Sequence, residues 1–238
     1  MNDRAALPPV LLAHGWGGSF DATYGAAFWH DIFADAGLSV AGLDLPGHGR
    51  RPASHDAADY GDLAGAAEKD IRDDIEDAVG FSLGSKLLLE LECRKPGRFR
   101  RLVLGGVGAN VFAPERGVEA VADVLESGAV DDAPEPVKMM IRYAAPSRSD
   151  PLALAAVLRR APNPQFTRER LARVKAKILF INGENDKGVA PVTELADCIP
   201  GCASMTLSKT GHIDLPDDPR FAEAAAAFLS ENINAKQK

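Results

Sequence analysis

Cysteine is scarce in this 238-residue sequence, and the few cysteines present form no recognisable pattern. Cys93, Cys198 and Cys202 are too few for a disulfide-stapled scaffold, and they lack the paired spacing of a zinc site. Their odd number is typical of a chain whose thiols stay reduced, with a Cys198–Cys202 disulfide as the alternative. Hydrophobic residues make up 46% of the chain, so we expect a packed core to provide the stability.

Long hydrophobic runs and an excess of positive charge are also absent. No apolar stretch approaches the length of a membrane span, and residues 1–7 contain no apolar segment of the signal-peptide kind. The formal net charge is −7 and the sequence pI is about 5.3, which argues against a nucleic-acid-binding surface. We therefore expect a soluble, cytoplasmic protein that binds neither membrane nor nucleic acid.

One local cluster of basic residues stands out between a predicted helix and a predicted strand. It comprises Arg94, Lys95, Arg98, Arg100 and Arg101. Positive side chains are favourable at a helix C-terminus, so this cluster predicts a solvated helix end, with an anion site as the alternative.

Short apolar runs alternate with helical patterns along most of the chain, which predicts an α/β fold. The runs expected to be strands are 8–13, 38–43, 77–81, 101–107, 177–182 and 203–207. The segments expected to be helices are 26–36, 60–72, 82–94, 115–127, 134–144, 150–160, 191–198 and 219–233. Alternation of this kind favours a mostly parallel sheet of about six strands with helices on both faces.

The interval from 111 to 172 breaks the alternation. It contains helical pieces separated by seven prolines and no strand-like run. We therefore expect a single core domain formed by 1–110 and 173–238, interrupted by a helical insertion at 111–172.

The pentapeptide Gly80-Phe81-Ser82-Leu83-Gly84 joins the predicted strand 77–81 to the helix that follows. A serine at a tight strand-to-helix turn can present its hydroxyl above the sheet, and small residues on either side relieve the crowding. By composition, Gly-x-Ser-x-Gly arises by chance about once in ten chains of this length. Its position between a strand and a helix is what makes it informative.

Three further loops at the carboxyl ends of predicted strands carry reactive residue types: 14–16, 183–188 and 209–214. Parallel sheets place their chemistry at this edge. A serine hydroxyl needs a base within hydrogen-bonding reach, and a carboxylate can orient that base. The order Ser82, Asp186, His212 supplies one group from each of three strand ends.

These motifs resemble the α/β-hydrolase superfamily, and the resemblance covers nearly the whole chain. It implies that Ser82 is the nucleophile, Asp186 the acid and His212 the base. It further implies that the main-chain N–H groups of Trp16 and Leu83 form an oxyanion hole, and that the insertion at 111–172 is a lid. Because few residues precede the first predicted strand, we expect the two leading strands of larger members to be absent. Phe81 stands where many relatives carry His or Gln.

Several residues have more than one interpretation. Glu184 is the alternative to Asp186 as the partner of His212. His14 is expected to brace the oxyanion loop, and Asp214 to cap the closing helix region. The candidate side chains for a substrate pocket are His14, Trp16, Phe81, Met139, Met140 and Tyr143, and the alternative for the Met and aromatic residues at helical spacing is ordinary packing.

The sequence thus predicts a serine hydrolase that cleaves an ester or related acyl bond of a small molecule, without a metal or organic cofactor. A non-catalytic ligand-binding protein on the same fold is the first alternative. A lyase or C–C hydrolase using the same three residues is the second. The oligomeric state is not predicted.

Overall fold

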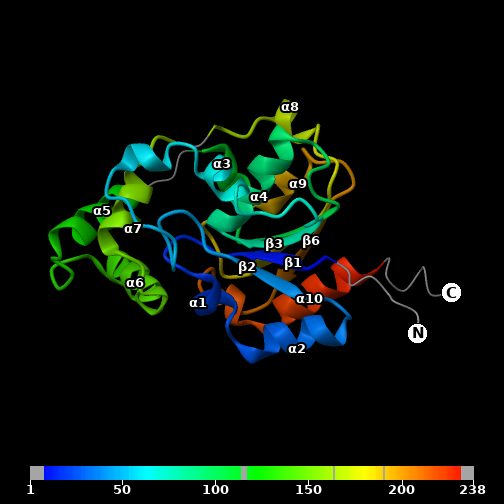
Figure 1. The fold of residues 1–238 in the computed structure, drawn as a ribbon, viewed down its shortest axis with the longest axis horizontal. Helices are drawn as coiled ribbons and strands as arrows, with labels where there is room; N and C mark the ends of the chain where they lie inside the picture. The colour runs from blue at the N-terminus through cyan, green and yellow to red at the C-terminus, as the bar shows by residue number, and fades with distance from the viewer. Residues whose placement is uncertain (1–7, 114–116, 163, 190, 232–238) are drawn as a thin grey trace.

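The computed structural model describes residues 8–113, 117–162, 164–189 and 191–231, and its centre is one parallel β-sheet (Figure 1). The spatial order of the strands is β2-β1-β3-β4-β5-β6, and every neighbouring pair is parallel. The six strands are β1 (Val10–Ala13), β2 (Val40–Leu43), β3 (Asp77–Phe81), β4 (Arg101–Gly105), β5 (Lys177–Gly183) and β6 (Ala203–Leu207). This confirms the predicted fold class, including the strand that enters the Ser82 turn.

The helices of the described chain follow the strands as crossover connections or lie in the insertion. They are α1 (Phe20–Tyr24), α2 (Ala27–Asp35), α3 (Leu63–Glu68), α4 (Leu83–Arg94), α5 (Val118–Ser127), α6 (Glu135–Ala144), α7 (Pro151–Arg159), α8 (Arg168–Leu171), α9 (Val192–Ala196) and α10 (Pro219–Ser230). Four 3₁₀ turns accompany them: η1 (Ala57–Tyr60), η2 (Ala109–Phe112), η3 (Ala145–Ser147) and η4 (Leu215–Asp217).

Both faces of the sheet are covered, which explains the continuous apolar runs of the central strands. In β1, Leu11 and Ala13 face the core beneath α3 and α4, whereas Val10 and Leu12 face the core beneath α2 and α10. Figure 1 shows the two helical layers on opposite sides of the sheet. Each fully buried aliphatic side chain contributes about 1.5–3 kcal/mol of transfer free energy, so these two cores dominate the stability.

The insertion between β4 and β5 forms a helical cap at one end of the molecule (Figure 1). Helices α5, α6 and α7 enclose a small apolar cluster of their own, built on Val121, Ala133 and Val137. The fourth helix of the predicted insertion, α8, packs instead on the core through Leu171. The part of the insertion that stands away from the sheet is therefore α5 to α7.

Some predicted elements differ from the structure. The sequence did not indicate α1 or α8, which span only five and four residues. The helix predicted at 60–72 is divided because Gly61 ends η1 and the Asp62 carboxylate accepts the Gly65 N–H to begin α3. The start of the predicted helix 115–127 and the end of 219–233 extend beyond the described residues.

The basic cluster is predicted to be a solvated helix end, and for Arg101 this prediction is wrong. Its side chain is fully buried, and its guanidinium donates to the carbonyl oxygens of Phe228 and Leu229 at the end of α10. Arg100 pairs with Asp77, so neither arginine serves the end of α4 as predicted.

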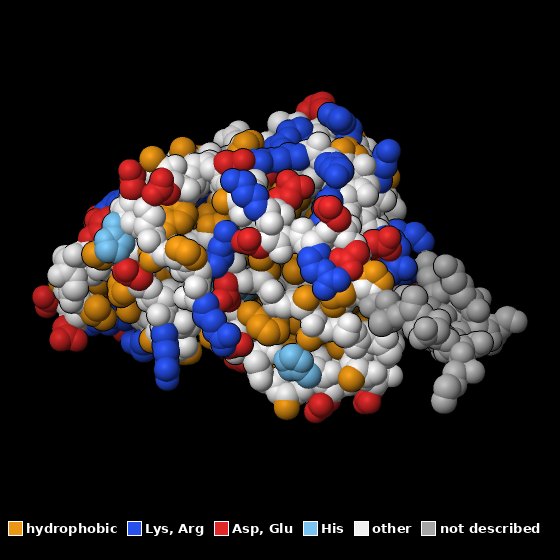
Figure 2. Space-filling model, in the orientation of Figure 1, with side chains coloured by type: hydrophobic (Ala, Val, Ile, Leu, Met, Phe, Trp, Pro, Cys, Tyr) orange, Lys and Arg blue, Asp and Glu red, His pale blue; other side chains and the backbone are white. Residues whose placement is uncertain are grey.

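The surface shows charges of both signs. Lys and Arg lie among Asp and Glu across the face seen in Figure 2. The three thiols are free. Within the described ranges, no helix combines the length and apolar character needed to cross a membrane.

Candidate active site

Ser82 occupies a strained turn between β3 and α4. Its backbone angles are φ 49° and ψ −108°, a conformation that a residue with a side chain rarely adopts. The neighbouring glycines allow the turn. A Cβ on Gly80 would lie 2.7 Å from the Ser85 backbone, and one on Gly84 would lie 2.2 Å from the Ala13 carbonyl oxygen.

The turn is also held by hydrogen bonds to the next strand. The Ser82 N–H and the Ser85 hydroxyl both donate to the Gly105 carbonyl at 2.8 Å. These bonds compensate part of the cost of the strained backbone, and they fix the direction of the Ser82 side chain.

The structure brings Ser82, His212 and Asp186 together in a hydrogen-bonded row. The distance from Ser82 Oγ to His212 Nε2 is 3.0 Å, and from His212 Nδ1 to Asp186 Oδ2 it is 2.5 Å. A carboxylate can only accept, so Nδ1 carries the proton and Nε2 presents its lone pair to the Ser82 hydroxyl. The Asp186 side chain is 3% exposed and that of His212 is 35% exposed, so the carboxylate is shielded while the imidazole reaches the surface.

His212 is held in place by the loop after β4. A Cβ on Gly106, whose φ is +68°, would lie 2.9 Å from His212 Cε1. The Phe81 ring packs against the imidazole with centroids 5.1 Å apart. Behind them, the side-chain amide of Asn182 bonds both the N–H and the carbonyl of Val107, which shapes this loop.

The structure distinguishes between the two candidate acids. Asp186 contacts His212, whereas Glu184 accepts from the Lys209 N–H at 3.0 Å in an exposed position. Asp214 stands at the N-cap position of η4, before the closing helix, but its side chain makes no capping hydrogen bond there. It accepts from the Gly211 N–H, and Asp218 is the N-cap of α10.

The two N–H groups predicted to form the oxyanion hole belong to segments that adjoin Ser82. Gly15 packs beside the serine, since a Cβ there would lie 3.3 Å from Ser82 Cβ, and Leu83 follows it as the first residue of α4. Among the described residues, neither the Trp16 N–H nor the Leu83 N–H has an acceptor within hydrogen-bonding distance. Free donors at a helix N-terminus favour an anionic oxygen.

His14 connects the loop after β1 to the loop after β2 by hydrogen bonds. Its Nδ1 donates to the Gly15 carbonyl at 2.7 Å, and its Nε2 accepts from the Leu45 N–H at 3.0 Å. His48 lies beside it, with ring centroids 5.3 Å apart, and donates to the Pro46 carbonyl. Burial lowers the pKa of His14 to about 4 and that of His48 to about 3, so both rings are neutral.

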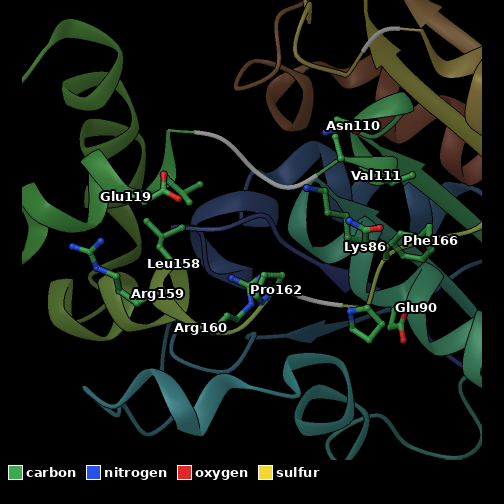
Figure 3. A pocket seen from close by; sticks show the side chains of 14 residues that line it. Lys86, Glu90, Asn110, Val111, Glu119, Leu158, Arg159, Arg160, Pro162 and Phe166 are labelled. Carbon is green, nitrogen blue, oxygen red and sulfur yellow. The ribbon is translucent and has the colours of Figure 1, made fainter.

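A cavity of about 390 Å³ lies between the cap and the core (Figure 3). Lys86 and Glu90 of α4 form part of its core wall, and Glu119 of α5 and Leu158 of α7 form part of its cap wall. Ser82, Asp186 and His212 do not line it. Among the described residues, the lining consists of Lys86, Glu90, Asn110, Val111, Ala113, Val118, Glu119, Leu158, Arg159, Arg160, Pro162, Pro164, Gln165 and Phe166.

None of the side chains predicted to line a substrate pocket borders this cavity. His14 and Phe81 are fully buried behind Ser82 and His212. On the cap, Met139 is 49% exposed, Met140 joins the cap cluster and Tyr143 packs against the core beneath α2 and α10. Burial raises the pKa of Tyr143 to about 12.

Sequence reasoning missed the residues of the cavity wall. The only signal was the spacing of Lys86 and Glu90, which places both on one face of α4, one and two turns after Ser82. No group of three or more His, Cys, Asp or Glu side chains in the described segments is arranged to hold a metal ion.

A parallel sheet that carries a serine turn, a histidine and a carboxylate at its carboxyl edge is the architecture of α/β-hydrolase enzymes. The chain belongs to the alpha/beta hydrolase family, whose model matches residues 10–226.

Two curated proteins are similar in sequence. Pimeloyl-[acyl-carrier protein] methyl ester esterase of Aromatoleum aromaticum is 32% identical over 146 residues, which cover 58% of this chain and 55% of that protein. The chain thus matches only about half the length of that relative. Monoacylglycerol lipase of Mycolicibacterium smegmatis is 29% identical over 75% of this chain and 70% of that protein.

Solved structures share the fold over nearly the whole chain. MenH from S. aureus superposes with a TM-score of 0.74 and covers 97% of this chain and 96% of its own. Its sequence identity is 21%, so the similarity concerns the fold alone.

Proposed function

We propose that the protein is a serine hydrolase that cleaves carboxylic esters through an acyl-enzyme intermediate. The observation that carries this proposal is the continuous hydrogen-bonded row from Ser82 Oγ through His212 to Asp186. In this proposal Ser82 is the nucleophile, His212 the general base and acid, and Asp186 the group that orients the imidazole.

The first half of the reaction acylates Ser82. The Ser82 oxygen attacks the ester carbonyl while its proton passes to His212 Nε2, 3.0 Å away. The imidazolium that forms is stabilised by the Asp186 carboxylate at Nδ1. His212 then returns the proton to the departing alcohol as the C–O bond breaks.

The second half releases the acyl group. A water molecule gives a proton to His212 Nε2 and attacks the acyl carbonyl, and the Ser82 oxygen takes the proton back as it leaves. In both halves the carbonyl oxygen becomes negative next to the N–H groups of Trp16 and Leu83. Loss of one such donor costs about 10²- to 10³-fold in kcat in a serine hydrolase.

The names of both sequence relatives support an ester as the substrate, since one is an ester esterase and the other a lipase. The cavity between cap and core, of about 390 Å³, supports a substrate whose acyl or alcohol portion extends away from Ser82. Its wall begins at Lys86, one turn along α4 from Ser82, and Leu158 belongs both to this wall and to the apolar cap cluster.

The test is hydrolysis of p-nitrophenyl esters of increasing acyl length by the wild type and by Ser82→Ala. We expect measurable turnover that Ser82→Ala reduces to the level of the buffer. Leu158→Trp, which fills cavity volume, is expected to shift the preference towards shorter chains. A wild type inactive across the series, or an active Ser82→Ala variant, contradicts the proposal.

A further inference from the structure

Trp16 connects the active site to the cap through its side chain. Its indole Nε1–H donates to the carbonyl oxygen of Leu154, in the middle of α7, at 3.2 Å. The ring packs both against the core beneath α3 and α4 and against the cap cluster. A single side chain therefore joins the two parts, and it belongs to the residue whose main-chain N–H is proposed above as an oxyanion donor.

The backbone around Trp16 is a tight turn with little support of its own. The Gly18 N–H donates to the Gly15 carbonyl at 3.1 Å, and Gly17 has φ +77°. Trp16 is thus the second residue of a four-residue turn whose other members are all glycine. Glycines give the turn no side chains with which to fix its orientation, so Trp16 provides that anchor.

The cap also contacts the turn from a second direction. A Cβ on Gly17 would lie 2.9 Å from Ala144 Cβ and 3.6 Å from Tyr143 Cδ1, both at the end of α6. The turn is therefore held between α6 at Gly17 and α7 at the Trp16 indole. On the core side of the turn, His14 Nδ1 donates a hydrogen bond to the Gly15 carbonyl.

We propose that the cap determines the geometry of the oxyanion hole, with the Trp16 side chain as the positioning residue that transmits it. When α6 and α7 sit on the turn, the Trp16 N–H is fixed beside Ser82. When the indole loses its hold on α7, this donor moves and the transition state loses part of its stabilisation. The inference rests on the proposed hydrolase function and adds a role for the cap beyond covering the site.

The first variant is Trp16→Phe, which keeps an aromatic ring in the joint but removes the donor to Leu154. A displacement of about 1 Å at a catalytic group can cost up to 100-fold in rate. We expect kcat for p-nitrophenyl acetate to fall about 10- to 100-fold while KM stays within about twofold, because the interaction with the oxyanion exists only in the transition state.

Trp29→Phe is the matched control, because Trp29 is the only other tryptophan. Its indole likewise donates to a main-chain carbonyl, that of Pro216 at 2.9 Å, but in the core between α2 and η4. We expect this control to lower the melting temperature and to keep kcat. A purely structural role for Trp16 predicts the same behaviour in both variants.

A second variant approaches the contact from the cap. Ala144→Leu places a larger side chain against Gly17, whereas the same change at the exposed neighbour Ala145 touches neither the turn nor the site. We expect Ala144→Leu to lower kcat about 10-fold and Ala145→Leu to leave it unchanged. The double variant Trp16→Phe/Ala144→Leu should lose less than the product of the single losses, because both act on one turn.

The outcomes separate this inference from the proposed function. A kcat of Trp16→Phe within twofold of the wild type, or a loss confined to KM, overturns the inference while Ser82→Ala still shows the enzyme to be a serine hydrolase. If Trp16→Phe fails to fold, an unchanged kcat in folded Ala144→Leu overturns it. An inactive wild type would instead reject the function on which the inference rests.

Discussion

Asp186 and His212, 26 positions apart in the sequence, meet through Oδ2 and Nδ1 at 2.5 Å. The contact depends on two neighbouring strands, because Asp186 follows β5 and His212 follows β6. Gly183 makes the approach possible, since a Cβ there would lie 2.2 Å from the Thr210 carbonyl oxygen. The Asn185 N–H also donates to that carbonyl at 2.9 Å, which ties the two loops together.

The first prediction compares the two acids of this loop. Asp186→Asn removes the charge that orients His212 and should lower kcat by about 10³- to 10⁴-fold. Glu184→Gln is the matched control in the same loop, and it should keep kcat within twofold because the Glu184 carboxylate bonds the Lys209 N–H and not His212. Steady-state kinetics on one ester measures both, and equal losses in the two variants would contradict the assignment.

The second prediction concerns Gly106. An added methyl group in Gly106→Ala would lie 2.9 Å from His212 Cε1 and would push the imidazole away from Ser82. We expect kcat to fall at least 10-fold. Gly37→Ala is the control, because Gly37 also has a positive φ, +75°, but no atom within 4 Å of the added Cβ. Both variants should lose about 1 kcal/mol of stability from the backbone, whereas only Gly106→Ala should lose activity.

The third prediction is a pH dependence of stability caused by His14 and His48. Both rings are buried and neutral, with pKa values lowered to about 4 and about 3, whereas in the unfolded chain they titrate near 6.5. The unfolded state therefore binds extra protons below pH 6.5. The free energy of unfolding should fall as the pH drops from 6.5 towards 4, by about 1.4 kcal/mol per pH unit for each histidine.

Urea unfolding at several pH values measures this slope. Comparison of His48→Gln with the exposed His30→Gln isolates the buried ring from the carboxylates that also titrate in acid. The slope between pH 6 and 4 should become shallower by about one proton in His48→Gln only. Equal slopes in the two variants would contradict the assignment of a neutral, buried His48.

The fourth prediction concerns Glu92, a fully buried carboxylate in α4. It accepts hydrogen bonds from four main-chain N–H groups, those of Gly97, Phe99, Lys175 and Ala176, and so ties the end of α4 to the start of β5. In Glu92→Gln the side-chain NH₂ replaces one of the two accepting oxygens. Because this NH₂ cannot accept a hydrogen bond, at least one main-chain N–H loses its partner. We expect a loss of about 2–3 kcal/mol in the free energy of unfolding, with kcat unchanged at temperatures where the protein is folded. The exposed Glu223→Gln should lose less than about 0.5 kcal/mol, and a similar loss in both variants would contradict this role.

The sequence predicted the sheet well because its central strands are buried on both faces and therefore appear as apolar runs. The residues of the Ser82, His212 and Asp186 row were also predictable, since each lies in a loop at the carboxyl end of a strand. The choice between Asp186 and Glu184 depended on family resemblance. The conformation of the loop directs the Asp186 side chain to His212 and the Glu184 side chain to the Lys209 N–H. Local sequence does not indicate this loop conformation.

Other features depend on contacts between distant positions. Local sequence predicts that Arg101 belongs to a solvated helix end. Its actual hydrogen-bond acceptors are carbonyl groups at the end of α10, more than a hundred residues later, so local sequence could not indicate them. The bond between Trp16 and Leu154 spans 138 positions, so nothing in the glycine-rich loop indicated an attachment to the cap. The described part of the cavity wall is likewise assembled from α4 and from distant positions between β4 and β5, and its residues carry no motif.

Ser82 is proposed to accept the acyl group, and covalent labelling of this side chain is the sharpest test of that role. The protein is treated with a fluorophosphonate, and the adduct is measured by intact mass and located by peptide mapping. We expect one adduct per chain, on Ser82, with labelling abolished in Ser82→Ala and strongly slowed in His212→Ala. Labelling at another residue, or undiminished labelling of Ser82→Ala, would contradict it.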